Sequence, residues 1–265
     1  MKTNLKNLKL IAIAFSLFAL PFNALADSFD LYLCGTGTAG LIPDPTVTGT
    51  LKANDQLIWQ EFTSAGAPTG SATTVTVVTN AVAPPFTVTG LAVGAHYYKV
   101  HVVTASANSC AGDVSPAFNV YSLPAPGVAL GAPTNTSFCA ENSNATLNSS
   151  TITATATALA PVLSDVGYEF TWTATKDAGS GAVAVADVTT VGSIAAITTP
   201  VNVNSFTLNS TAGSGAYVFK AAVKYKVSSG TLRGDNGTGC TAESAASSTI
   251  TVTPKPGTPT IIIAP

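Results

Sequence analysis

Bulky apolar side chains fall on every second position in several short stretches of the chain. Trp59 lies in one of them, QLIWQEF at 56–62, and Trp172 lies in another, YEFTWT at 168–173. Successive side chains of a strand point to opposite faces, so a period of two predicts strands that each bury one face. The same alternation recurs at 75–77, 86–89 and 249–253. Because Gly, Pro and Asn turns separate these stretches, the pattern predicts all-β sandwich structure.

The alternating stretches belong to a unit that occurs twice. Each copy has an early Cys, a Trp strand, a Phe strand, a Gly that opens a Tyr-containing strand, a late Cys and a closing strand that runs into Pro-x-Pro-Gly. The matching landmarks are Cys34 and Cys139, Trp59 and Trp172, Phe86 and Phe206, Gly94 and Gly215, and Cys110 and Cys240. Their separation grows along the chain, so the second copy carries extra residues, which loops absorb most easily. We therefore expect two homologous sandwiches, each with one central Trp as a core anchor.

The first 26 residues are typical of a secretory signal peptide. Three lysines precede the apolar run LIAIAFSLFALPF, and Ala24-Leu25-Ala26 is a small-x-small cleavage signal. The run is too short to favour a spanning helix, and no second run occurs, so we expect no membrane insertion after cleavage. The expected organisation is a signal peptide at 1–26, sandwiches at 27–123 and 134–254, a Pro-rich linker with an opening strand at 124–133, and a C-terminal tail at 255–265.

Four cysteines in an exported chain indicate disulfides, since exported proteins fold in an oxidising compartment. Three pairings are possible. The repeat places Cys34 and Cys110 in the first unit and Cys139 and Cys240 in the second, so we favour one disulfide within each domain. No cysteine belongs to a C-x-x-C pair, and the chain has only two histidines, so the sequence predicts no zinc site.

Composition and scattered polar residues argue against several functions. The net charge is −2 and only 9% of residues are charged, so no basic surface for nucleic acid is expected. His96 and His101 have an odd spacing on one predicted strand, which points them to opposite faces. No G-x-S-x-G motif accompanies them, and the acidic residues form no calcium-loop cluster. We expect no enzyme activity, no cofactor and no metal.

The order of these landmarks resembles known modules. An early Cys, a Trp strand, a Gly-x-x-Tyr or Gly-x-Tyr corner, a late Cys and a final strand into Pro-x-Pro are similar to the immunoglobulin-like and PKD-like repeats of bacterial secreted and cell-surface proteins, particularly those of Bacteroidota. The resemblance covers essentially the whole mature chain. It implies immunoglobulin-like sandwiches that act as spacers, adhesive segments or filament parts. The chain departs from the antibody pattern because Cys110 follows its strand instead of lying within it.

The last residues repeat the linker. Pro124-Ala125-Pro126-Gly127 leads into the apolar segment 128–133, which we expect to open the second sandwich, and Pro254-Lys255-Pro256-Gly257 leads into the apolar segment 261–265. The candidate assembly strand is Thr260-Ile261-Ile262-Ile263. A strand of β-branched residues needs a partner for its backbone and its apolar side chains. Three explanations stay open: a fragment of a longer array, a tail that folds back, or a strand that adds to a neighbouring copy. Strand addition to a neighbouring copy joins two different surfaces, so the contact does not close and the copies form a thread.

These observations predict a non-enzymatic, secreted structural or adhesive protein of the bacterial surface that self-associates or packs against neighbouring immunoglobulin-like domains. The alternative is a carbohydrate-binding or spacer module of a larger surface array, with a glycan or another surface ligand as its partner. A sugar face stacks on exposed aromatic rings, and the candidate rings are Tyr32, Tyr97, Tyr98, Tyr121 and Tyr225.

Overall fold

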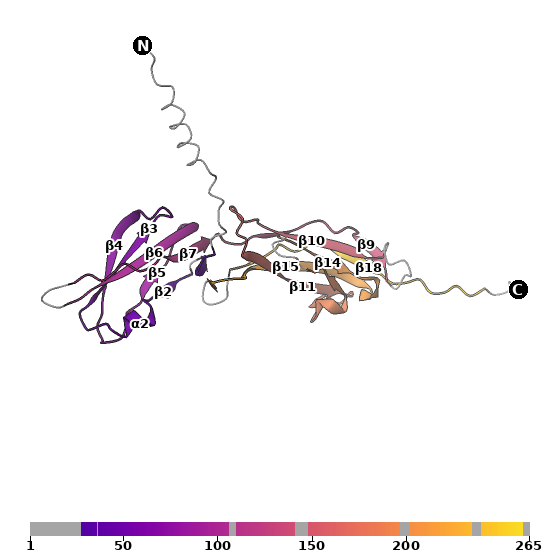
Figure 1. Cartoon of the computed structure of the whole chain (residues 1–265). Helices are drawn as coiled ribbons and strands as arrows, with labels where there is room; N and C mark the ends of the chain where they lie inside the picture. The colour runs from indigo at the N-terminus through magenta and orange to yellow at the C-terminus, as the bar shows by residue number, and fades with distance from the viewer. Residues whose placement is uncertain are drawn as a thin grey trace, which may run out of the picture.

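Two β-sandwiches follow one another along the chain and lie end to end (Figure 1). The structure is a computed structural model, and it describes residues 28–35, 37–105, 110–140, 148–196, 202–234 and 240–261. The predicted signal peptide lies outside these residues. The described chain is mostly β-structure, as the alternating pattern predicts, and it forms two pairs of sheets.

The first domain packs a large sheet on a small one. Its elements are β1 (Leu31–Cys34), β2 (Ala39–Leu41), α2 (Pro45–Thr48), β3 (Gln56–Phe62), β4 (Pro68–Thr76), β5 (Phe86–Val88), β6 (Gly94–Val103) and β7 (Phe118–Leu123). The large sheet has the order β1-β7-β6-β3-β4, and β2 pairs with β5 in the small sheet. Trp59 on β3 is 3% exposed and stacks on Phe86 of β5, with ring centroids 5.1 Å apart. The stacked rings therefore join the two sheets.

The second domain repeats this plan with more strands. Its strands are β8 (Val128–Leu130), β9 (Ser137–Cys139), β10 (Ser150–Ala156), β11 (Val166–Asp177), β12 (Ala182–Ala184), β13 (Gly192–Ile194), β14 (Val203–Leu208), β15 (Gly215–Val227), β17 (Thr241–Glu243) and β18 (Ile250–Thr253). Two short 3-10 turns, η1 (Val188–Thr190) and η2 (Ser210–Ala212), flank β13 and β14. One sheet has the order β12-β11-β15-β18-β9, and the other has the order β13-β14-β10-β8. Trp172 of β11 is buried against Phe206 of β14, with ring centroids 5.8 Å apart.

A strand from the second half of the chain completes the large sheet of the first domain. β16 (Thr231–Arg233) follows β15 after a short turn and pairs in parallel with β1, so that Tyr32 lies opposite Leu232. Farther along the chain, Cys240 forms a disulfide with Cys34, and their Cα atoms are 5.7 Å apart. The disulfide therefore connects the two domains. Our prediction of one disulfide within each domain, Cys34 with Cys110 and Cys139 with Cys240, is wrong.

The strand directions explain why Cys34 and Cys110 cannot pair. Cys34 lies opposite Leu123 at the end of β7, where the chain leaves the first domain. β6 begins at this same end, because Gly94 lies opposite Ser122, and it then runs away for the length of the sheet before Cys110 follows. A strand of ten residues spans about 30 Å. The two cysteines of the first unit therefore lie at opposite ends of the domain.

Side chains of the first domain also join the core of the second. Phe29, Tyr32 and Tyr121 belong to the same buried cluster as Trp172, and the rings of Phe29 and Tyr121 meet edge to face at 4.9 Å. The hydroxyl of Tyr32 donates to the carboxylate of Asp165, and burial is the main reason that its pKa lies above the usual value. A shared core, a shared sheet and a disulfide make the joint between the domains stiff.

Candidate functional site

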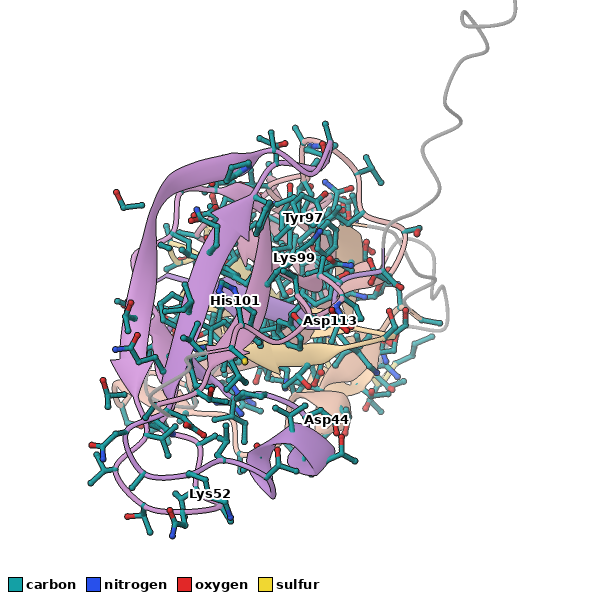
Figure 2. All side chains as sticks on the ribbon, turned by 60° about the vertical axis from the view of Figure 1, so that its left-hand side comes forward. Asp44, Lys52, Tyr97, Lys99, His101 and Asp113 are labelled. Atoms are coloured by element: carbon teal, nitrogen blue, oxygen red, sulfur yellow. A yellow bond between two sulfur atoms is a disulfide. The ribbon has the colours of Figure 1, made fainter. Side chains whose placement is uncertain are left out.

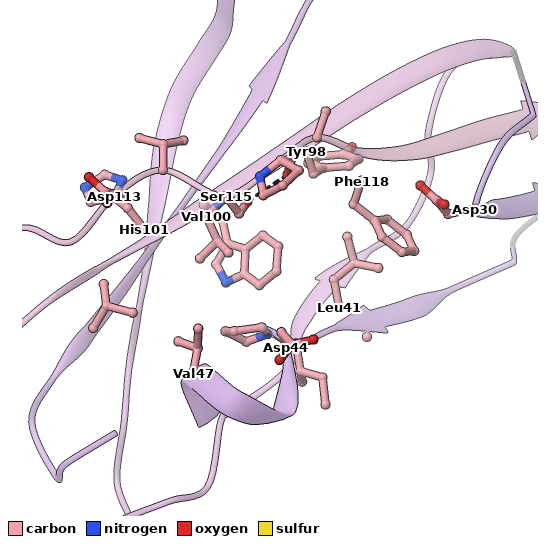
Figure 3. A pocket seen from close by; sticks show the side chains of 18 residues that line it. Asp30, Leu41, Asp44, Val47, Tyr98, Val100, His101, Asp113, Ser115 and Phe118 are labelled. Carbon is pink, nitrogen blue, oxygen red and sulfur yellow. Dashed lines mark hydrogen bonds between the residues drawn. The ribbon is translucent and has the colours of Figure 1, made fainter. Parts of the chain in front are cut away.

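An open groove of about 720 Å³ runs along the first domain between its two sheets (Figure 3). One wall comes from β2 and α2, the opposite wall comes from the segment that leads into β7, and β3 and β6 form the floor. The lining residues on which the argument depends are Leu41, Ile42 and Val47 of the first wall, Val114 and Phe118 of the second, and Trp59, Tyr98 and Val100 of the floor.

The local sequence shapes both walls. Pro43 and Pro45 end β2 and start α2, and the Asp44 carboxylate caps this helix by accepting from the Thr46 backbone N–H at 2.8 Å. On the other wall, Ser115 is held to β6, because its Oγ accepts from the Val100 N–H at 3.0 Å. Figure 3 shows Val47 of α2 across the groove from Ser115. The groove is therefore built by fixed elements on both sides.

Apolar side chains in the groove are exposed to solvent. Ile42 and Val114 are each 56% exposed, and Val47 and Phe118 are 38% and 37% exposed. They lie on the two walls and line one continuous depression. A contiguous apolar depression on a soluble domain is typical of a binding surface.

The floor holds a buried polar atom that lacks a partner. The indole Nε1 of Trp59 makes no hydrogen bond to any part of the chain that the structure describes. In the second domain, the matching Nε1 of Trp172 donates to Oδ1 of Asn204 at 2.7 Å. Buried donors are normally paired, since an unpaired one costs about 1–3 kcal/mol. Among the described residues, the Trp59 N–H thus lacks the partner that Asn204 supplies to Trp172.

A strand fills the equivalent place in the second domain. β10 matches β2 in the repeat, because Ile152 lies opposite Phe206 as Leu41 lies opposite Phe86. On its other edge β10 pairs antiparallel with β8, and Val128 and Leu130 of β8 pack against the core. Within the described residues β2 pairs with β5 alone. The groove therefore corresponds to the place that β8 fills in the second domain.

The rim of the groove is acidic. Asp30, Asp44 and Asp113 lie along it, and Asp113 is beside His101 at one end (Figure 3). The hydroxyl of Thr46, followed by its backbone N–H, holds the pKa of Asp44 below the usual value, so this carboxylate is ionised at neutral pH. Tyr97, Lys99 and His101 follow one another along β6 (Figure 2), while Tyr98 and Val100 alternate with them and contribute to the floor. An occupant with a positive charge would complement this rim.

The tail that the sequence predicts as an assembly strand extends away from the second domain (Figure 1). Residues 254–261 are all exposed and form no strand, and Ile261 is 97% exposed. Thr260 is in this described part, whereas Ile262 and Ile263 lie outside the described residues. Nothing in the described part of the tail folds back on its own domain.

The other candidate residues are placed as follows. Tyr32, Tyr98, Tyr121 and Tyr225 are buried, and so are both tryptophans, so these rings present no open face on which a sugar could stack. His96 contacts Oε1 of Glu61 through Nδ1 at 2.7 Å, and His101 lines the groove. The described residues contain no cluster of three or more His, Cys, Asp or Glu that could hold a metal ion. In the same residues, no helix is long and apolar enough to cross a membrane.

Sequence reasoning missed the groove. The signal that could have revealed it lies in the repeat: an apolar opening segment precedes Cys139, and the matching positions before Cys34 fall in the predicted signal peptide. Comparing what precedes Cys34 with what precedes Cys139 would have shown it.

Comparisons with known proteins add little to this geometry. No protein-family model matches the chain, and no curated protein matches it. Among solved structures, the chain is similar to the fibronectin(III)-like modules of CbhA from Clostridium thermocellum, with 16% identity over 87% of this chain and 93% of that chain, and a TM-score of 0.34. A match this distant carries no inference about family, source or function.

Proposed function

We propose that this protein is a secreted structural subunit that assembles head to tail, with the tail of one copy filling the groove in the first domain of the next. The donor is the apolar strand Thr260–Ile263, and the acceptor is the edge of β2. Strand addition of this kind stabilises a complex through main-chain hydrogen bonds and through apolar side chains that enter pockets. Because donor and acceptor are different surfaces, the contact does not close and builds a thread.

One observation carries the proposal: the same linker and apolar segment occur twice, and among the described residues only the second domain has its acceptor place filled. After β7, the linker Pro124–Gly127 leads into β8, which completes the second domain. After β18, the linker Pro254–Gly257 leads into the tail, and the open groove in the first domain is the place that matches the one β8 occupies. The tail therefore carries an apolar segment that matches β8, and the first domain carries a groove that matches the place of β8.

Signal-peptide cleavage after Ala26 would leave the groove of the first domain open. β8 ends at Leu130, nine residues before Cys139. Counting the same nine residues back from Cys34 leads to Leu25, which is upstream of the expected cleavage point after Ala26. Cleavage there removes any segment of the first domain that could fill its own groove. Exported protein would then carry an open acceptor and an exposed donor.

Charge supports the same partner. Lys255 is the single charged residue of the tail, and the rim of the groove carries three aspartates. Opposite charges at a rim increase the association rate and select the partner more than they increase affinity. The disulfide and the resemblance to bacterial surface modules support an extracellular location, because disulfides persist in oxidising compartments.

A synthetic peptide of residues 257–265 should bind to the mature protein truncated after Pro256, residues 27–256. Burial of three Ile side chains contributes about 5–9 kcal/mol before the cost of association is subtracted, so we expect a dissociation constant on the order of 10 µM. Fluorescence anisotropy of the labelled peptide measures this binding. The acceptor keeps both cores intact, because all of the described residues removed, 257–261, are exposed.

A peptide in which Ile262 is replaced by Asp is the matched control, since it keeps the length and the linker. It should bind at least tenfold more weakly, because an ionised side chain loses its hydration in an apolar groove. Equal affinity of the two peptides, or no binding of either at 1 mM, would show that the groove does not take the tail.

A further inference from the structure

The joint between neighbouring subunits should repeat the joint between the two domains of one chain. Inside the chain, a strand leaves the first domain, opens the second, and a disulfide between Cys34 and Cys240 locks the connection. If the tail fills the groove of the next copy, the contact between subunits has the geometry of the contact between domains. The second domain of one subunit then takes the part of the first domain within a chain, and the first domain of the next subunit takes the part of the second. The two remaining cysteines, Cys110 and Cys139, then correspond to the two that form the disulfide.

Strand pairing shows how closely Cys139 corresponds to Cys34. Cys34 lies opposite Leu123, the last residue of β7, in a parallel pair. Cys139 lies opposite Thr253, the last residue of β18, also in a parallel pair. Each cysteine therefore sits beside the point where the chain leaves its domain for the next strand. Cys139 is partly exposed, and Thr253 Oγ1 donates to its Sγ at 3.5 Å.

Cys110 corresponds to Cys240 in the same way. Immediately after Cys240, Thr241 pairs with Lys224 of β15, and immediately after Cys110, Ala111 pairs with Val103 of β6. Lys224 and Val103 lie nine residues after the matching glycines that open these two strands, Gly215 and Gly94. Cys110 is exposed, and its backbone N–H donates to Thr104 Oγ1 at 3.1 Å. The backbone around each late cysteine is thus anchored at the same end of its sandwich.

The two cysteines also lie at opposite ends of the molecule. Cys139 is at the end of the second domain where the tail emerges, because Thr253 leads directly into it. Cys110 follows the end of β6 that points away from the joint between the domains. A bond between them inside one chain would have to span both sandwiches. A bond between successive copies needs only the head-to-tail contact.

We propose that Cys139 of one subunit forms a disulfide with Cys110 of the next, so that the assembled thread is covalently locked at every joint. This inference rests on the proposed strand addition, which brings the two sulfur atoms together. The oxidant is a disulfide compound of the compartment. The Cys139 thiolate attacks its S–S bond and releases one thiol; the Cys110 thiolate then attacks the mixed disulfide and releases the second. The cysteines lose two protons and two electrons, and the oxidant's disulfide is reduced to two thiols.

Mature protein assembled with oxidised glutathione should give a ladder of covalent oligomers on a non-reducing gel, and the ladder should collapse to monomer on reduction. Cys110→Ser and Cys139→Ser, tested singly, should remove the ladder while threads persist in negative stain. A mixture of the two variants should give covalent dimers and nothing larger, because each joint then needs one subunit of each kind. Truncation after Pro256 should slow cross-linking of the unaltered cysteines more than tenfold.

The outcomes separate the two proposals. Threads without a covalent ladder, or dimers formed by the Cys139→Ser variant alone through Cys110, would overturn the intersubunit disulfide and leave strand addition intact. Absence of threads in every protein, including the unaltered one, would contradict strand addition itself. A melting temperature equal to that of the unaltered protein confirms that each serine variant is folded.

Discussion

Mature protein that carries Ile42→Asp and Val114→Asp is expected to remain monomeric at concentrations where the unaltered protein forms threads. Both residues line the groove, one on each wall, and both are 56% exposed, so their replacement leaves the fold of the free domain intact. A bound tail would cover them and remove the water around two ionised carboxylates, which is costly without a pairing cation. We expect the dissociation constant of the joint to rise at least about 100-fold, equivalent to about 2.7 kcal/mol. Sedimentation velocity measures the change.

Val183→Asp is the matched control for this experiment. Val183 lies on β12 of the second domain, is 66% exposed and does not line the groove. The control should assemble like the unaltered protein. Threads of normal length from the Ile42→Asp, Val114→Asp variant would place the contact between copies somewhere other than the groove.

Removal of the disulfide between the domains should have the largest effect on stability. Cys34 and Cys240 are separated by 206 residues, and the chain-entropy model assigns about 5 kcal/mol to a crosslink over such a loop. A loss of this size lowers the melting temperature of a chain of this length by about 10–20 °C. The double variant Cys34→Ser, Cys240→Ser should also bend at the joint, which small-angle scattering detects as a broader distribution of interatomic distances.

The remaining cysteines supply the control for this prediction. The variant Cys110→Ser, Cys139→Ser keeps the disulfide at the joint, and it should melt within a few degrees of the unaltered monomer. If the Cys34→Ser, Cys240→Ser variant has the same melting temperature and the same scattering profile as the unaltered protein, the disulfide is not what stiffens the joint. The shared aromatic cluster and the β1–β16 pair would then do so without it.

The period of two was sufficient to predict the sandwich strands around both tryptophans. Trp59 and Trp172 are buried because their strands alternate apolar and polar residues, and this alternation is a local property of the sequence. The opening strand after the first linker was also predictable, because the apolar segment 128–133 follows a Pro-rich elbow, and its first three residues form β8. Local signals of this kind depend only on neighbouring residues.

The disulfide pairing depends on information that the spacing does not carry. The repeat assigns each cysteine to a unit, but it does not say at which end of the unit the cysteine lies. That end depends on strand direction: β1 runs parallel to β7, which places Cys34 at the joint. The short β16 was equally hidden, because Thr231–Arg233 reads as part of a Gly-rich loop until β1 is available to pair with it.

The groove could be found only by comparing the two domains in space. Its walls come from β2, α2 and the segment before β7, which are far apart in the sequence. Its significance comes from β8, which occupies the same place in the other domain. The Ile run identified the tail as a candidate donor strand, but the sequence did not indicate the sheet edge to which the tail would add.

The most direct test compares the mature protein, residues 27–265, with the same protein truncated after Pro256. Sedimentation velocity and negative-stain microscopy of both, at equal concentration, report whether copies associate. We expect threads from the intact protein and folded monomers from the truncated one. If both proteins remain monomeric, or if both form the same threads, the tail is not an assembly strand and the proposed function is wrong.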